Sequence, residues 1–244
     1  MQKYSNIKYS IVKLLSRLVP KAVYNELKQQ EIDVDDFANK YYSQEGEEII
    51  LMRYFAYKKS GFFVDIGAHH PSRLSNTYKL YQMGWQGVNI DAMPGSMRAF
   101  QEKRNRDINV EAAVSDIAQT LSYFKFNESA LNTLDAEKAK RIIDDGIYQC
   151  IGKEEIYTKT LKQILDKEML QNNKIDFFTI DVEGFDLKVL KGNDWEKYKP
   201  EVIIIETNDI IFDLTLKNET TLYLENIGYK VFAKTNKSVF YALV

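Results

Sequence analysis

The chain has 244 residues, 45% hydrophobic and 28% charged, which is enough for one α/β domain with a full core and too little for a second large domain. Its 33 Lys and Arg against 35 Asp and Glu give a net charge of -2, which argues against nucleic acid as a main partner. A single cysteine, Cys150, excludes an internal disulfide and a multi-thiolate metal site. No run approaches the roughly 18 apolar residues of a membrane span, and no leader with an apolar core and cleavage site is visible, so we expect a cytoplasmic protein.

Residues 1–60 show helical spacing of apolar side chains, and we interpret them as an N-terminal helical segment. The clearest stripe consists of Ile7, Ile11, Leu14, Leu15 and Leu18, beside basic residues. Such a stripe can lie on an anionic membrane surface, but it more often docks on its own domain or on a second subunit. A homo-oligomer formed through these helices is therefore one expected arrangement.

From residue 62 onwards, short apolar runs alternate with helical stretches, which is typical of βαβ units around a parallel sheet. The pattern predicts strands at 62–66, 87–91, 108–114, 175–181 and 201–206, and helices at 75–83, 95–103, 161–165 and 185–190. Residues 229–234 and 238–244 flank a short polar turn and predict an antiparallel hairpin that closes the sheet. Residues 127–155 have no clear period, so we interpret them as an inserted lid or substrate-facing segment of a domain over 61–244.

The residues that follow the first two strands predict a nucleoside site, because ligands of open α/β sheets bind beyond the carboxyl ends of the strands. Gly67 permits a tight turn and a close approach of the backbone, and Asp65 offers a carboxylate. Asp91 ends the second strand, where an acidic side chain can accept hydrogen bonds from both hydroxyls of a ribose. Taken alone, Asp91 fits a helix N-cap equally well.

The glycine pattern limits which nucleoside cofactor fits. A dinucleotide fingerprint needs further glycines after Gly67, but His69 and Ser72 stand at those positions. A G-x-x-x-x-G-K-[ST] phosphate loop is also missing. A cofactor with a ribose and no phosphate remains.

Four blocks of the sequence resemble FkbM-type S-adenosylmethionine-dependent methyltransferases: residues 43–47 (SQEGE), 63–69 (FVDIGAH), 89–94 (NIDAMP) and 180–186 (IDVEGFD). The resemblance covers roughly residues 42 to 210 and implies a class I methyltransferase fold, a Rossmann-like doubly wound sheet of seven strands with a reversed C-terminal hairpin. It also implies O-methylation of sugar or polyketide hydroxyls.

Matched residue by residue, the resemblance implies a set of cofactor contacts. It places the methionine end of S-adenosylmethionine by Asp65, Gly67 and Gln44, the ribose by Asp91, and the adenine near Ser115 and Asp116. The adjoining positions that we include in this predicted cofactor site are Ala68, His69, Ala92 and Asp181.

Three residues are candidates for methyl transfer itself, which requires a group to take the proton of the acceptor. His70 lies on the cofactor loop, and we consider it as a base or substrate contact against the alternative of a structural hydrogen bond. Asp181 and Glu183 follow the fourth strand and point to the same side of it. They can instead cap the helix that follows.

A metal site is a further hypothesis. Asp181, Glu206 and Asn208 are oxygen donors at adjacent strand ends, and such a set can hold Mg²⁺. A hydrogen-bonded polar rim is the favoured alternative, because such carboxylates commonly line pockets without a cation, so no metal ligand is assigned.

We therefore predict an S-adenosylmethionine-dependent O-methyltransferase that acts on a sugar hydroxyl of a nucleotide-activated sugar or another glycan precursor. The substrate class follows from the resemblance alone. The alternatives are a non-catalytic nucleoside-binding partner subunit and a methyltransferase of a non-sugar small molecule.

Overall fold

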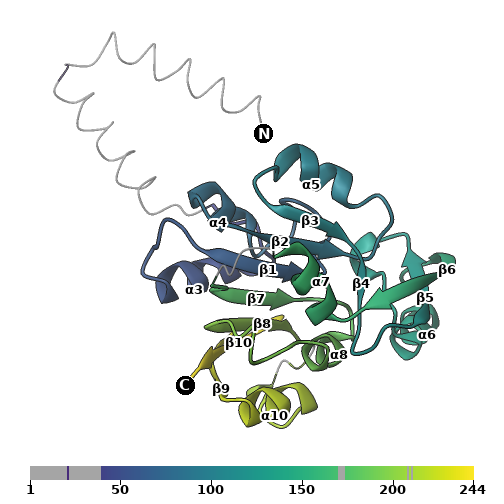
Figure 1. Ribbon diagram of the computed structural model, residues 1–244. Coiled ribbons are helices and arrows are strands. Elements are labelled where there is room, and N and C mark those ends of the chain that lie inside the picture. The colour runs from purple at the N-terminus through teal and green to yellow at the C-terminus, as the bar shows by residue number, and fades with distance from the viewer. Residues whose placement is uncertain (1–20, 22–39, 170–173, 208, 210) are drawn as a thin grey trace. The chain divides into compact units, whose positions relative to one another are not determined.

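The computed structural model describes residues 21, 40–169, 174–207, 209 and 211–244 (Figure 1). The chain divides into two compact units, Met1–Lys40 and Tyr41–Val244, and the second carries every element described below. The apolar stripe between Ile7 and Leu18 lies outside the described residues. Within the described part, no helix is long and apolar enough to cross a membrane.

The main sheet has seven strands in the order β3-β2-β1-β7-β8-β10-β9. The first five are parallel, and β10 runs antiparallel to both β8 and β9. The predicted doubly wound sheet with a reversed C-terminal hairpin is thereby confirmed. In the order of the sheet, the strands span Ile108–Glu111, Gln86–Asp91, Phe62–Ile66, Phe177–Ile180, Val202–Glu206, Ser238–Leu243 and Tyr229–Lys234.

Alternation along the strands explains the two helical layers that cover the sheet. Val64 and Ile66 of β1 pack into one apolar cluster, whereas Phe63 between them packs into another on the opposite face. The first cluster includes side chains of α7 (Leu161–Glu168), α8 (Asp186–Lys191) and α10 (Glu219–Asn226). The second includes side chains of α3 (Glu47–Tyr54) and α4 (Tyr78–Met83). Both faces are buried, as near-continuous apolar strands require.

The register between β7 and β8 brings two acidic residues together. The last paired residues are Ile180 and Ile205, and the next residue along each strand is Asp181 and Glu206. By the period of two, both carboxylates point to the face that carries Phe177 and Ile204. Parallel strands end at the same edge, so this pair lies where a ligand is expected.

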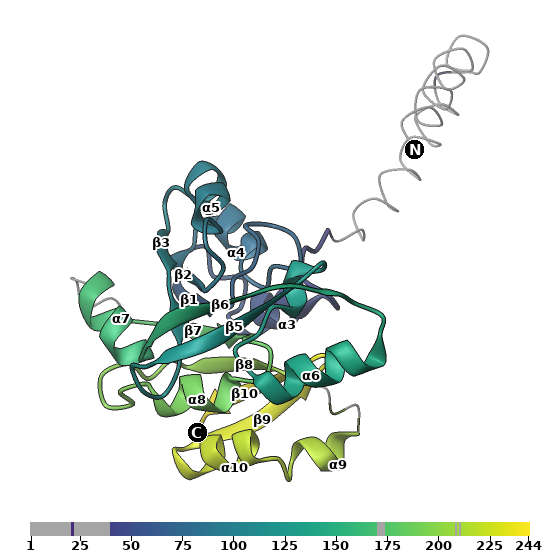
Figure 2. The same ribbon diagram turned by 90° about the vertical axis from the view of Figure 1, so that its right-hand side faces the viewer.

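The segment without a clear sequence period is more regular than predicted. A second sheet of order β4-β6-β5 contains β4 (Ala113–Val114), β5 (Thr120–Phe126) and β6 (Cys150–Lys159), and α6 (Ala136–Asp145) lies between β5 and β6. Figures 1 and 2 show this sheet and α6 beyond the carboxyl ends of the main strands. The predicted strand over 108–114 is divided at Ala112, because β3 pairs with β2 and β4 pairs with β6.

Candidate functional site

A cleft opens at the carboxyl ends of β1, β2 and β7 and contains about 570 Å³ of empty space, part of it open to solvent. Its floor includes Gly67, Asp91 and Asp181 from the ends of these strands. Residues 129–134, which lie between β5 and α6, form the opposite wall. The segment that we interpreted as a lid or substrate-facing insertion thus lines one side of the cleft.

Gly67 makes the floor of the cleft possible. Its φ is +83°, and a Cβ built on it would lie 1.7 Å from the carbonyl oxygen of Asp181. The N–H groups of Gly67 and Ala68 both donate to the carbonyl of Ile90, at 2.9 and 3.0 Å. Only glycine fits here, since any side chain would separate the turn after β1 from the end of β7.

The Asp91 side chain accepts backbone hydrogen bonds from the turn after β1 and from the turn after β2. Its carboxylate accepts the N–H of His69 and the N–H of Met93, each at 2.8 Å. Burial raises the pKa of Asp91, and these two donors oppose the rise. The helix after β2 is α5 (Met97–Lys103), and its N-cap is Ser96, so the alternative of a helix cap at Asp91 is not realised.

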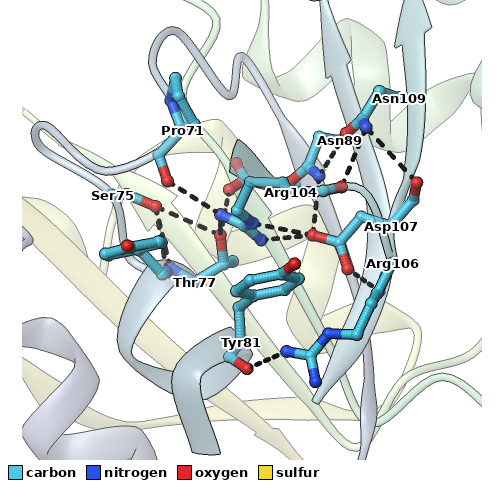
Figure 3. A network of polar contacts seen from close by, with 12 residues as sticks. Pro71, Ser75, Thr77, Tyr81, Asn89, Arg104, Arg106, Asp107 and Asn109 are labelled. Atoms are coloured by element: carbon cyan, nitrogen blue, oxygen red, sulfur yellow. Dashed lines mark hydrogen bonds and ion pairs between the residues drawn. The ribbon is translucent and has the colours of Figure 1, made fainter. Parts of the chain in front are cut away.

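Asp65 lies behind the cleft rather than in its lining. The hydroxyl of Thr77 donates to Asp65 at 2.7 Å, and burial raises the pKa of Asp65 to about 6. Arg104, itself fully buried, donates to Thr77 and to the carbonyl of Pro71 and forms an ion pair with Asp107 at 2.8 Å (Figure 3). This network holds the loop after β1 in place from its far side.

The two histidines have different surroundings. His69 lines the cleft, with φ +53°, and its Nε2 lies 3.2 Å from the guanidinium of Arg73. His70 is not among the lining residues, and its Nδ1 accepts the N–H groups of Ser72 and Arg73 at 3.1 and 2.9 Å. The structural hydrogen bond that we weighed against a catalytic His70 is therefore present.

Three carboxylates converge beside the cleft. One oxygen from each of Asp181, Glu183 and Glu206 lies within 4.8 Å of the other two. The Oδ1 atom of Asp181 is buried and has no hydrogen-bond partner among the described residues. Burial, followed by the charges of Glu206 and Glu183, raises the pKa of Asp181 well above its ordinary value. Asn208, the third oxygen donor of our metal hypothesis, lies outside the described residues.

Lys138 of α6, which sequence reasoning missed, forms ion pairs with two of these carboxylates. Its ammonium pairs with Glu183 and lies 3.9 Å from Glu206. Burial alone would lower the pKa of Lys138, but these two carboxylates outweigh burial and raise it. Asp135 and Gly146 bound α6 as N-cap and C-cap, a signal from which the helix could have been predicted. No local signal predicts where its lysine points.

A second, smaller pocket shares Asp181 with the cleft. It is also lined by Gln44, Asn76, Glu206 and Lys237. The SQEGE block explains how Gln44 reaches this place, because its glutamates bind the turn between β9 and β10. Glu45 accepts from Asn236 and the N–H of Lys237, and Glu47 accepts from the hydroxyls of Thr235 and Ser238.

The structure thus brings together some of the predicted site residues and not others. The cleft lining includes Gly67, His69, Asp91, Ala92, Asp181 and Glu183. Gln44 lies in the second pocket. The predicted residues outside both linings are Asp65, Ala68, His70, Ser115 and Asp116. Where adenine was predicted near Ser115, the cleft is lined instead by Ala112, Val114 and Tyr123.

Comparison with known proteins gives one match to a family. The model of the methyltransferase FkbM domain matches residues 65–231. No curated protein matches the chain significantly. Among solved structures, the chain is similar to a precorrin-6y C5,15-methyltransferase from Geobacter metallireducens GS-15, with 16% identity over 86% of this chain and 96% of that chain and a TM-score of 0.45. It is also similar to a TehB-like SAM-dependent methyltransferase from Corynebacterium glutamicum ATCC 13032 Kitasato, with 10% identity over 92% and 100% of the two chains and a TM-score of 0.40.

Proposed function

The chain belongs to the methyltransferase FkbM domain family, and on this premise we propose that it uses S-adenosylmethionine to methylate a hydroxyl group of a sugar, in a nucleotide-activated sugar or another glycan precursor. Family membership makes it a methyltransferase. The methyl donor, the hydroxyl acceptor and the roles of individual residues are our proposal.

The residues of the cleft fit the adenosyl part of this cofactor. Each oxygen of Asp91 accepts one N–H, which leaves a lone pair on each for a ribose hydroxyl. Gly67 lets the turn after β1 approach the end of β7 at the floor of the cleft, and Val114 and Tyr123 offer an apolar wall to a base. When bound, S-adenosylmethionine supplies a methyl group on a sulfonium, which needs no further activation.

The observation that carries the proposal is the position of Asp181 between the two cavities. It lines both the cleft and the second pocket, and its buried Oδ1 has no partner among the described residues. We assign the proton of the acceptor hydroxyl to the carboxylate of Asp181. A carboxylate with a raised pKa holds such a proton more firmly than an ordinary aspartate.

The second pocket supports a polar acceptor. Gln44, Asn76, Glu206 and Lys237 provide both donors and acceptors of hydrogen bonds, which suits a molecule with several hydroxyl groups. His70 contributes to neither lining, so Asp181 is the better candidate for the base. His69, which does line the cleft, remains a candidate cofactor contact.

Two measurements test the proposal. Calorimetry of the full chain with S-adenosylhomocysteine should show a single site with micromolar affinity and no comparable binding of NAD. Transfer from methyl-labelled S-adenosylmethionine should then be screened over nucleotide sugars, with small amines as the control acceptors. NAD binding as tight as that of the adenosyl ligand would reject the cofactor, and transfer to amines alone would reject the hydroxyl acceptor.

A further inference from the structure

We propose that the Lys138 ammonium is the built-in cation of the Asp181–Glu183–Glu206 cluster and occupies the place that a divalent metal ion would otherwise take. In this role Lys138 is a positioning residue, supplied to the active site by the inserted segment. The inference deepens the proposed function, because the cluster contains the residue to which we assign the acceptor proton.

Among the residues that the structure describes, the ion pairs of Lys138 are those with Glu183 and Glu206. Its side chain is 15% exposed, and those of Glu183 and Glu206 are 11% and 14% exposed. The ammonium contacts Glu183 directly and lies 3.9 Å from Glu206. Charges that are this far removed from water are tolerated only when they are paired. A cation therefore stabilises this group of three carboxylates, and Lys138 forms ion pairs with two of them.

Local structure fixes the direction of Lys138. It lies in the first turn of α6, where its N–H and that of Glu137 donate to the Asp135 side chain. The hydroxyl of Thr133 donates to the carbonyl of Glu183 at 2.7 Å, so the segment before α6 is held at the same loop. Figure 2 shows α6 beside the end of β8. These hydrogen bonds hold the first turn of α6 and the segment before it, and thereby fix the position of Lys138.

The loop after β7 has an unusual backbone conformation where it contacts Lys138. Glu183 has φ +54°, an unfavourable value for a residue with a side chain, and Gly184 follows with φ +102°. A Cβ on Gly184 would lie 2.9 Å from the Asp135 carboxylate and 3.5 Å from Cδ of Lys138. The glycine thus lets α6 approach closely enough for Lys138 to reach Glu183.

A metal ion fits less well once Lys138 is in place. Mg²⁺ requires six oxygen ligands at about 2.0–2.1 Å in octahedral geometry. The ammonium already occupies the coordinating side of Glu183, and a dication among these carboxylates would lie within a few ångströms of a positive charge. The fixed positive charge also stabilises the ionised state of an acceptor oxygen beside Asp181, which is what a Mg²⁺ ion at this place would do.

Metal binding provides a test that needs no acceptor. Mn²⁺ should be titrated into the full-length wild type, Lys138→Met and Lys140→Met, with free Mn²⁺ measured by electron paramagnetic resonance. Lys140 is the matched control, because it is an exposed lysine on the same helix. We expect wild type and Lys140→Met to bind Mn²⁺ only weakly and equally, whereas Lys138→Met gains a site at least tenfold tighter. Adding Glu183→Gln to Lys138→Met should remove that site.

The same proteins give a second readout in thermal unfolding. Lys138→Met should unfold at a lower temperature than Lys140→Met, and Mn²⁺ should restore part of the loss, while Lys138→Arg stays close to wild type. If Lys138→Met does not fold without metal, refolding in Mn²⁺ but not in chelator supports the inference equally.

Tight Mn²⁺ binding by wild type that Glu183→Gln abolishes would overturn the inference, as would identical behaviour of Lys138→Met and Lys140→Met. Neither readout involves methyl transfer or an adenosyl ligand. A chain that fails to bind S-adenosylhomocysteine would therefore reject the proposed function without affecting this result.

Discussion

At the scale of single residues, Asp91 and Gly67 account for the cleft. Gly67 permits the close contact with the end of β7, and Asp91 orders the two turns that face it. The sequence predicted both residues for the cleft, because they stand at the carboxyl ends of strands, where ligands bind in an open α/β sheet. The same reasoning placed Asp65 in the cofactor site, but in the structure its side chain accepts a hydrogen bond from Thr77, which in turn accepts one from the buried Arg104.

Replacing Asp91 should weaken binding of the adenosyl ligand. Asp91→Ala removes the acceptors that we assign to the ribose hydroxyls, at a cost on the order of 1 to 3 kcal/mol. Calorimetry measures the change, and circular dichroism establishes that the variant is folded. Asp144→Ala is the matched control, because Asp144 is exposed on α6 and lies outside the cleft lining. Equal affinities for both variants would contradict the ribose assignment.

Replacing Asp181 should slow methyl transfer and leave cofactor affinity nearly unchanged. Asp181→Asn keeps the size of the side chain and removes the proton acceptor, so we expect a fall in turnover of roughly 10² to 10⁴. Because only the ionised form accepts a proton and its pKa is raised, the wild-type rate should fall on the acid side at a pH above the ordinary aspartate value of about 4. A variant that retains full turnover would exclude Asp181 as the base.

His70→Asn separates the two candidates for the base. The Nδ1 atom of His70 accepts two backbone N–H groups, and the asparagine oxygen can replace it in part. We therefore expect turnover within a few-fold of wild type and an unchanged acid limb in the pH–rate profile. A loss of about 10² or more with normal cofactor affinity would return the catalytic role to His70.

At the scale of elements, the sequence predicted the strands of the main sheet better than the segment that closes the cleft. The runs in β1, β7 and β8 are apolar on both faces, which gives a strong signal. Most residues of β5 and β6 are exposed or half-buried, including Lys153, Glu154 and Glu155, so these strands lack an apolar signal in the sequence. They form because β6 pairs with both β5 and β4. The adjacency of β7 and β8 predicted that Asp181 and Glu206 would meet, but no local signal could place Lys138 beside Glu183 and Glu206.

The contact between the start of α3 and the β9–β10 turn should contribute measurably to stability. Glu47 is buried and accepts hydrogen bonds from Thr235 and Ser238, so Glu47→Ala removes the acceptor of the buried Ser238 hydroxyl and of the half-buried Thr235 hydroxyl. We expect a loss of about 2 to 4 kcal/mol in the free energy of unfolding, measured with urea. Glu102→Ala, on the exposed face of α5, should stay within about 0.5 kcal/mol of wild type. Equal stabilities of the two variants would remove the anchoring role from Glu47.

At the scale of the whole molecule, buried carboxyl groups govern how stability depends on pH. Burial raises the pKa values of Asp65 and Asp186 to about 6, and the N–H groups of Val182 and Gly184 only partly oppose this at Asp186. The folded state therefore holds these protons more firmly than the unfolded state. Their contribution to stability is present below about pH 4 and is lost as the pH rises through about 6.

Asp186→Asn should flatten this dependence. Asparagine keeps an acceptor for only one of the two N–H groups, which costs a constant amount of stability, but it does not ionise. The difference in stability from wild type should therefore shift in favour of the variant between pH 4 and 7, by up to about 3 kcal/mol. Urea unfolding at several pH values measures the difference. The control is Asp166→Asn on the surface, because hydrogen bonds from Lys162 and Lys197 lower the pKa of Asp166. Its difference from wild type should stay constant over the same range, and a parallel curve for Asp186→Asn would contradict the assignment.

The most direct test of the account is a crystal structure of the full chain with S-adenosylhomocysteine, the product that remains after methyl transfer. We predict that both ribose hydroxyls lie within hydrogen-bond distance of the Asp91 carboxylate, that the base contacts Val114 and Tyr123, and that the sulfur faces Asp181 at the boundary with the second pocket. A ligand bound outside this cleft, or a ribose more than about 3.5 Å from Asp91, would contradict it.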